Sequence, residues 1–340
     1  MRKILSLVLV VAMLLSMVVL AVPASAEAAG NETDLMIKTW EKPWESSDPL
    51  VSSDWIAIGS LTDWFAVFDN ANNAALAGHK YYLTADLDFS SCRDRGDSQP
   101  SDFVLDGNGH SITLAETGKN IVLFDKPGNI TIKNLVIKGN VKAYGDNPDD
   151  KNGVFLSPFA KWDHSGWTKM YNVTSAINVK YTRTVDDGQY LSGLVGVCRD
   201  GSELENVKFT GSMTVGNRAM LDGVGGIAAR TYGNVSIKNC SNQGNIEFQG
   251  KAACYAGGEK SAPSSQHVGV GGIVGYSEGS GGHVTFENCT NNANIFYSGF
   301  EMYYHAVVDP ETNRKTQSTN PAVKSDGGAA GCRGDRKSVV

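Results

Sequence analysis

A short glycine-aliphatic phrase recurs along the chain with a fixed companion, an asparagine followed by an apolar residue. The three clear copies are residues 193–196 (GLVG), 226–229 (GIAA) and 272–275 (GIVG). Asn206 and Asn239 each follow the start of their phrase by 13 residues, and Asn288 follows by 16. The phrases begin 33 and 46 residues apart, so a constant core carries inserts of variable length. A repeat of this kind predicts a stack of coils, each of which is one structural unit.

The residue after the asparagine predicts an interior column of this stack. Stacked parallel strands lie about 4.8 Å apart, so equivalent positions line up. With two looser upstream copies, the column reads Leu135, Val173, Val207, Cys240 and Cys289. We expect the asparagines to occupy corners and to hydrogen-bond to their equivalents in the next coil. Glycine, asparagine and serine between the short β-rich runs are expected to supply the positive-φ turns.

The third phrase and its companion segment carry a resemblance to a known family. Residues 271–275 (GGIVG) followed by 288–295 (NCTNNANI) resemble the GLUG motif of bacterial surface β-helix proteins. Upstream, the segments that are similar to the capping helix and first coils of such adhesin-like chains are residues 61–73, 81–88 and 105–112. The resemblance covers about residues 60–331. It implies an all-β fold outside the cell, a right-handed parallel β-helix (β-solenoid) with an N-terminal capping helix, and it implies no particular ligand.

The sequence departs from this motif in two places. The closing glycine is lost at Ala228 and Ala229, and a long insert occupies residues 250–268. The path of the coils is therefore least defined by the sequence in these segments.

The amino terminus has the layout of a secretory signal peptide. Arg2 and Lys3 precede an apolar run over residues 4–22, and residues 23–26 (PASA) supply an Ala-x-Ala cleavage site. We expect residues 1–26 to be removed and the mature protein to be secreted or displayed on a bacterial cell surface. The alternative is an uncleaved anchor, because this run of 19 residues could nearly span a bilayer. No later run is long and apolar enough to span, so no stable membrane span is expected after cleavage.

The mature chain is expected to begin with a lead-in or linker, residues 27–60, followed by the repeat region, residues 61–334. The lead-in carries tryptophans among Pro, Ser and Asp with little periodicity. One convincing helix opens the repeat region, with Thr62 as its predicted N-cap. Its apolar residues at helical spacing are Leu61, Trp64, Phe65, Phe68 and Ala71. This stripe is expected to cover the open end of the first coil.

The last six residues, 335–340 (DRKSVV), are one translation of a common sequencing-library adapter. We therefore expect them to be an artefact and the β-helix to be truncated at its C-terminus, just after a further glycine phrase at residues 328–331. The tripeptide Arg333-Gly334-Asp335 would otherwise suggest integrin binding. Because its aspartate would be adapter-encoded, no cell-adhesion role is expected for it.

Charge and cysteine content argue against several functional classes. The net charge is −6, and nothing in the chain is basic enough for a nucleic-acid partner.

Six cysteines in an exported chain raise the question of disulfides. Equivalent positions in neighbouring coils lie farther apart than the Cβ spacing of about 3.8 Å that a bridge prefers, so Cys240 and Cys289 are expected to be small buried hydrophobes. Neither Cys-x-x-Cys nor His-rich spacing occurs, so neither zinc nor any other cofactor is expected.

Clustered carboxylates, which β-helix polysaccharide lyases and hydrolases require, are not evident. The acidic loops hold Asp146, Asp149 and Asp150, and Asp186 and Asp187. Neither loop has the alternating spacing of a calcium site, and both are typical of solvated turns. Asp86 and Asp88 share one strand face and are expected to be structural, and residues 107–110 (GNGH) are expected to form a turn. We therefore expect no catalytic or metal site. The alternative is that this chain is the N-terminal part of a polysaccharide-active enzyme, whose catalytic residues lie in missing sequence.

Aromatic residues in two excursions, residues 162–171 and 296–304, are the candidate binding residues. They are Trp162, Trp167, Tyr171, Tyr297, Tyr303 and Tyr304. Exposed aromatic faces stack on sugar rings or anchor a protein partner. The alternative is that they only fold their loops back onto the solenoid flank. The leading hypothesis is a non-catalytic adhesin-like module that binds carbohydrate or an extracellular or cell-wall protein, and a structural spacer is a further alternative.

Overall fold

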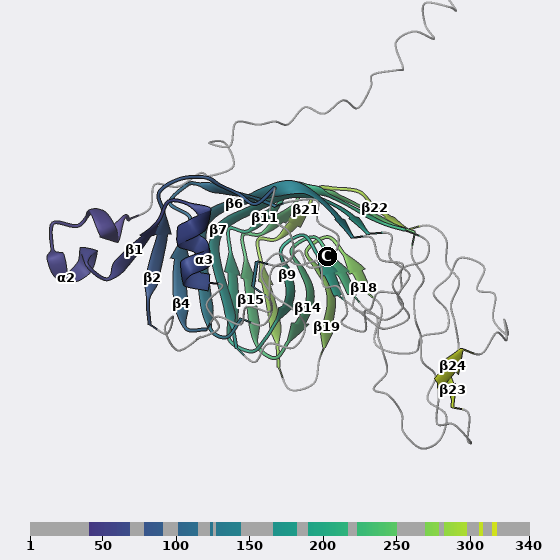
Figure 1. Cartoon of the computed structure of the whole chain (residues 1–340). Helices are drawn as coiled ribbons and strands as arrows, with labels where there is room; N and C mark the ends of the chain where they lie inside the picture. Colours follow the sequence, from purple (N-terminus) through teal and green to yellow (C-terminus); the bar gives the residue numbers. More distant parts are fainter. Residues whose placement is uncertain are drawn as a thin grey trace, which may run out of the picture. The chain divides into compact units, whose positions relative to one another are not determined.

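The computed structural model describes residues 41–68, 78–90, 101–114, 123–124, 127–143, 166–181, 190–216, 223–249, 269–278, 282–297, 306–308 and 315–317. The chain divides into two units, Met1–Ile37 and Lys38–Val340, and every described residue belongs to the second. The predicted signal peptide and residues 335–340 lie outside the described residues. Figure 1 shows the described part as strands stacked side by side, with α3 (Leu61–Phe68) beside the first of them.

A parallel sheet begins before the expected boundary at residue 61. Strand β1 (Trp55–Ile58) pairs in parallel with β2 (Lys80–Leu83), so the predicted lead-in supplies the first strand. Two short helices precede β1, η2 (Pro43–Glu45) and α2 (Pro49–Ser52). We call this line of parallel strands the first row, and it continues through β4 (Phe103–Asp106), β6 (Ile130–Ala143), β7 (Thr168–Tyr181), β10 (Ser202–Glu205), β15 (Val235–Lys238) and β20 (Val284–Glu287).

Two further rows run beside the first, because β6 and β7 are long enough to take part in all three. The second row contains β3 (Leu87–Asp88), β5 (Ser111–Leu114), the middle of β6 and β7, β11 (Lys208–Phe209), β16 (Ser241–Asn242) and β21 (Thr290–Asn291). The third row contains the ends of β6 and β7, β12 (Ser212–Val215), β17 (Asn245–Phe248) and β22 (Ile295–Tyr297). Every pairing in these rows is parallel.

Each glycine phrase begins just after a strand of one smaller parallel sheet and ends within a strand of another. One sheet contains β8 (Tyr190–Ser192), β13 (Gly223–Gly225) and β18 (Gly269–Gly271). The other contains β9 (Val195–Cys198), β14 (Ala228–Tyr232) and β19 (Val274–Glu278). Ala228 and Arg230, on either side of Ala229, each pair with both neighbouring strands, so the loss of the closing glycine does not interrupt the stack there. The insert at residues 250–268 lies outside the described residues, and β23 (Ala306–Val308) and β24 (Lys315–Gln317) form a separate antiparallel pair. The all-β expectation with parallel sheets is therefore confirmed.

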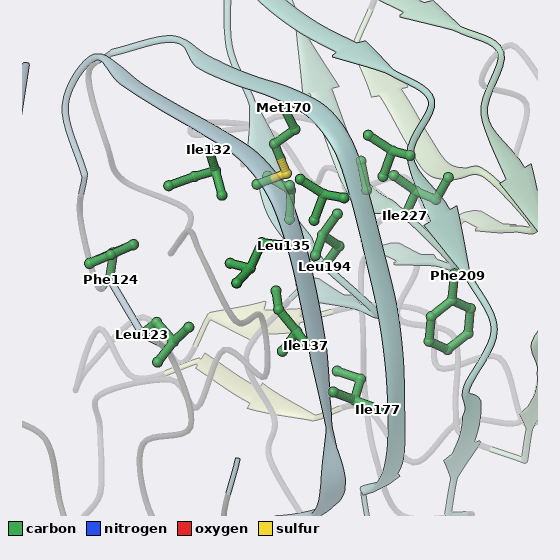
Figure 2. Packing of buried hydrophobic residues seen from close by; sticks show 14 of the residues in the cluster. Leu123, Phe124, Ile132, Leu135, Ile137, Met170, Ile177, Leu194, Phe209 and Ile227 are labelled. Atoms are coloured by element: carbon green, nitrogen blue, oxygen red, sulfur yellow. The ribbon is translucent and has the colours of Figure 1, made fainter. Parts of the chain in front are cut away.

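The predicted interior column is buried. Leu135, Val173, Val207 and Cys240 have no exposed surface, and Cys289 is partly buried against the same core. Figure 2 shows side chains of this core, including Leu135, Ile137, Leu194 and Ile227. Because consecutive copies align in parallel, each equivalent position forms a continuous column, and several such columns together build the interior.

The repeat asparagines occupy left-handed corners, as predicted. The φ angles are 54°, 55°, 54°, 53° and 51° at Asn134, Asn172, Asn206, Asn239 and Asn288. Asparagine tolerates this conformation better than most residues. The Nδ2 of Asn172 donates to Asn134 Oδ1 at 3.1 Å, and Asn206 Nδ2 donates to Asn172 Oδ1 at 3.2 Å. Asn288 donates in the same way to Asn239 at 3.2 Å, so the expected amide ladder is present across these pairs.

The ladder starts at a buried carboxylate. Asn134 Nδ2 lies 3.1 Å from both carboxylate oxygens of Asp106, whose side chain has no exposed surface. The backbone N–H of Asn108 donates to Asp106 Oδ1 at 2.8 Å, and Lys133 Nζ lies 3.3 Å from Oδ2. These donors offset part of the cost of burial, which raises the pKa of Asp106.

The expected positive φ occurs at glycines between strands, such as Gly201 and Gly233, whereas the phrase glycines serve close packing. Gly193, Gly226 and Gly272 are not among the residues with positive φ. A Cβ at Gly193 would collide with the carbonyl oxygen of Gly226 and the ring of Phe209, and a Cβ at Gly226 would collide with the carbonyl oxygen of Gly272. Each copy therefore packs so closely on the next that no side chain fits at this position.

Helix α3 (Leu61–Phe68) buries Trp64 and Phe68 in the core, in agreement with the predicted apolar stripe. The predicted N-cap at Thr62 is wrong. Ser60 caps the helix, because its Oγ accepts the backbone N–H of Asp63 at 3.2 Å. The Asp63 carboxylate in turn accepts the N–H of Gly59 at 3.1 Å, so the two side chains satisfy backbone donors on both sides of the helix start.

Of the two cysteines expected to be small buried hydrophobes, Cys240 is buried and Cys289 is only partly buried. Cys198, Cys240 and Cys289 are unbridged, and the first two are fully buried. Burial raises the pKa of the Cys198 thiol to about 12. Within the described ranges, no helix is long and apolar enough to cross a membrane.

Candidate binding face

Side chains that point outward from the first row form columns across its strands. The register places Lys169 between Thr131 and Glu203, and it places Tyr171 between Lys133 and Glu205. These positions alternate with Met170 and Leu204, which are buried in the core. Because successive side chains of a strand point to opposite faces, the columns face away from the interior. We call this surface the Trp167 face and define it by Trp167, Lys169, Tyr171, Glu203 and Glu205.

Four residues of the Trp167 face form one connected cluster. Lys169 Nζ lies 2.8 Å from Glu203 Oε1, and the Tyr171 hydroxyl donates to Glu203 Oε2 at 2.7 Å. The Lys169 ammonium also lies 5.0 Å from the centroid of the Trp167 ring, within the range of a cation–π contact. One carboxylate therefore fixes the positions of an ammonium and a phenol beside a half-buried indole.

The cluster is charged but balanced at neutral pH. The hydrogen bonds from Lys169 and Tyr171 hold the pKa of Glu203 below its usual range, so this carboxylate is ionised. Burial and the neighbouring Glu203 raise the pKa of Tyr171, so its hydroxyl keeps its proton. A protonated phenol of this kind is a poor base and a poor nucleophile. The cluster therefore suits recognition through stacking and hydrogen bonds better than proton transfer.

A second aromatic group lies at the start of the first row. The Trp44 ring stacks on Tyr82 with centroids 4.4 Å apart, and it meets Trp55 edge-on at 5.1 Å. The Lys133 ammonium lies 5.2 Å from the Trp55 centroid. Because these rings pack on one another, they attach the segment before β1 to the first strands.

The structure brings together two of the six predicted binding residues. Trp167 and Tyr171 both belong to the Trp167 face. Tyr297 ends β22 and pairs with Phe248 in the third row, so it lies in a different row. The other three, Trp162, Tyr303 and Tyr304, lie outside the described residues.

Sequence reasoning missed Lys169 and Glu203, which hold the cluster together. Alternation along residues 168–171 indicates that Lys169 and Tyr171 share a face. Their partner Glu203 is 34 residues from Lys169, and only the register between β7 and β10 brings the two together.

The acidic residues considered for catalysis hold the backbone where they are described. Asp86 Oδ1 accepts the N–H of Ser111 at 2.8 Å, and Asp88 Oδ1 accepts the N–H of Ser90 at 2.8 Å. Residues 107–110 form the expected turn, with φ of 49° at Asn108 and 82° at Gly109. The loop acids lie outside the described residues, namely Asp146, Asp149, Asp150, Asp186 and Asp187. In the part of the chain that the structure describes, no group of three or more His, Cys, Asp or Glu side chains is placed to hold a metal ion.

No protein-family model matches the chain. No curated protein matches it either. The structure is similar to the solved structure of a "putative immunoglobulin A1 protease" from Bacteroides ovatus, with 16% sequence identity and a TM-score of 0.39. The match covers 73% of this chain and 83% of that chain.

Proposed function

We propose that this chain is a secreted or cell-surface, non-catalytic adhesin-like module that binds a glycan or an extracellular protein through the Trp167 face. We further propose that its parallel rows form a right-handed parallel β-helix of the GLUG-motif kind. The register of neighbouring copies and the asparagine ladder support this architecture. The signal-like amino terminus supports export.

The observation that carries the proposal is the cluster around Trp167. The indole of Trp167 is partly exposed, and Lys169, Tyr171 and Glu203 hold oriented polar groups beside it. Binding sites for sugars and for protein anchors combine such an aromatic surface with a few fixed polar groups. Because Glu203 already holds Lys169 and Tyr171 in place, little side-chain entropy remains to be lost on binding.

The experiment is a retention assay of the exported protein on a panel of immobilised polysaccharides and extracellular proteins. Trp167→Ala should weaken binding to the retained ligand about tenfold, the effect of losing one aromatic anchor. Tyr190→Ala is the matched control, because Tyr190 is a half-buried aromatic residue of β8, outside the first row, with the Arg230 guanidinium 5.2 Å from its ring centroid. Unchanged retention of Trp167→Ala would refute the role of this face. Release of soluble oligosaccharides from the same panel would instead support a polysaccharide-active enzyme.

A further inference from the structure

The third row carries a polar surface that is separate from the Trp167 face. The register aligns Asn140, Asn178, Ser212 and Asn245 in one column. The next outward column contains Lys180, followed by Thr214 and Glu247 on the neighbouring strands. Between the columns the chain buries Val141, Val179, Met213 and Ile246, so the polar residues face outward.

This surface is hollowed. A groove of about 260 Å³ lies over the ends of β6 and β7 and over β12. Its polar lining is provided by Asn140, Asn178, Lys180, Ser212 and Thr214. A volume of this size is close to the lower end of the range for small-molecule sites, about 300 Å³.

The lining is a partly used hydrogen-bonding array. Asn178 Nδ2 donates to Asn140 Oδ1 at 3.0 Å, and Ser212 Oγ donates to Asn178 Oδ1 at 2.9 Å. Each primary amide has two N–H donors and an oxygen with two lone pairs, so these two bonds leave donors and acceptors available. The bonds also hold the two amides in fixed orientations. Fixed groups that both donate and accept match the vicinal hydroxyl groups of a sugar.

The array repeats along the stack. Adjacent parallel strands lie about 4.8 Å apart, so Asn140, Asn178 and Ser212 recur at that interval. An oligosaccharide that lies across the strands can therefore meet one polar side chain of this column with each successive sugar unit.

Lys180 gives the groove a positive charge. In the described part of the chain, Lys180 makes no ion pair, and its register neighbours are Lys142 and Thr214. The acid in its column, Glu247, lies two strands away, about 10 Å, and accepts a hydrogen bond from Gln249. An anionic ligand group would therefore find an ammonium that no described carboxylate neutralises.

We propose that this groove binds an acidic oligosaccharide, with a sugar carboxylate at Lys180 and sugar hydroxyls on Asn140, Asn178 and Ser212. The site is independent of the Trp167 face, so it goes beyond the function proposed above. A sulfated glycan presents related anionic chemistry, and the experiment separates it from a uronate.

The test measures binding of the full chain to three oligosaccharides of equal length by calorimetry: an oligogalacturonate, a sulfated oligosaccharide and a neutral one. The oligogalacturonate should bind most tightly, and added salt should weaken its binding. Lys180→Gln should weaken that binding about fivefold, as expected for one solvent-exposed ion pair, and should reduce its salt dependence. Asn178→Ala should weaken it by a similar factor without changing the salt dependence.

Lys238→Gln is the matched control, because it removes the same charge from an exposed lysine of the first row. Its affinity for the oligogalacturonate should equal that of the unaltered chain. Each of four results would overturn the proposal. They are equal binding of the neutral oligosaccharide and the oligogalacturonate, tighter binding of the sulfated oligosaccharide, no binding of any of the three, and an unchanged affinity for the oligogalacturonate in Lys180→Gln. Trp167→Ala acts on the other face, so failure of the groove and failure of the Trp167 face give different patterns.

Discussion

Replacement of Asn172 tests whether the asparagine ladder stabilises the stack through both its backbone and its side chain. Asn172 has φ of 55°, donates to Asn134 Oδ1 and accepts from Asn206 Nδ2. Alanine removes two hydrogen bonds, each with a net value of about 1 kcal/mol. It also tolerates the left-handed conformation less well than asparagine, which adds about 1 kcal/mol. Asn172→Ala should therefore lower the free energy of unfolding by about 3 kcal/mol.

Two comparison variants separate these contributions. Asn172→Gly keeps the backbone conformation and loses only the hydrogen bonds, so it should cost about 2 kcal/mol. Asn178→Ala loses the same number of side-chain hydrogen bonds from an exposed residue in an extended strand, where water replaces them, and should cost about 1 kcal/mol or less. Urea denaturation followed by circular dichroism measures all three. The reasoning fails if Asn172→Ala costs no more than Asn178→Ala, or if glycine at position 172 costs as much as alanine.

Three further predictions concern packing, pH and cysteine chemistry. Gly226→Ala should destabilise the protein by about 1–3 kcal/mol, because the added Cβ would meet the carbonyl oxygen of Gly272 in the next copy. Urea denaturation measures this loss, and unchanged stability would show that the copies pack less closely. The lowered pKa of Glu203 adds stability that is fully present above the usual glutamate pKa of about 4.3 and is lost as pH falls through the lowered value. The stability difference between the unaltered chain and Glu203→Gln should therefore shrink on acidification. A stability difference that does not depend on pH would contradict this prediction. The buried Cys198 thiol, with its pKa raised to about 12, should escape iodoacetamide in the native protein at about pH 8 and react after denaturation, as read by peptide mass spectrometry; rapid native labelling would contradict its burial.

Local repetition made the core predictable from the sequence. The apolar residue after each asparagine could be assigned to the interior because equivalent residues of stacked strands share one environment, as Leu135 and Val207 show. The left-handed corner at the asparagines could be predicted for the same reason. The role of the phrase glycines could not, because the collision at Gly226 involves a carbonyl oxygen from a copy 46 residues away.

Boundaries and caps were less predictable than the repeat. β1 was assigned to a linker because its pairing with β2 involves a neighbour in space that local periodicity does not reveal. The prediction of Thr62 as the helix cap overlooks Ser60 and Asp63, which have the spacing that satisfies both backbone donors.

The candidate site was only partly predictable. Trp167 and Tyr171 could be selected by residue type, since exposed aromatics favour binding surfaces. Glu203 and the amide groove could not, because both depend on the register between strands separated by inserts of different lengths. In a stacked fold, the side chains of one outward column come from several copies, and their alignment is fixed by pairing rather than by spacing in the sequence.

The most direct test of the proposed function is hydroxyl-radical footprinting of the chain with and without a saturating ligand from the retention panel. Oxidation of Trp167 and Tyr171 should fall when the ligand binds, because it covers the Trp167 face. Tyr232, in the separate sheet of β14, provides the internal reference and should keep its rate. Unchanged oxidation of Trp167 under saturating ligand would contradict the proposal that this face is the binding surface.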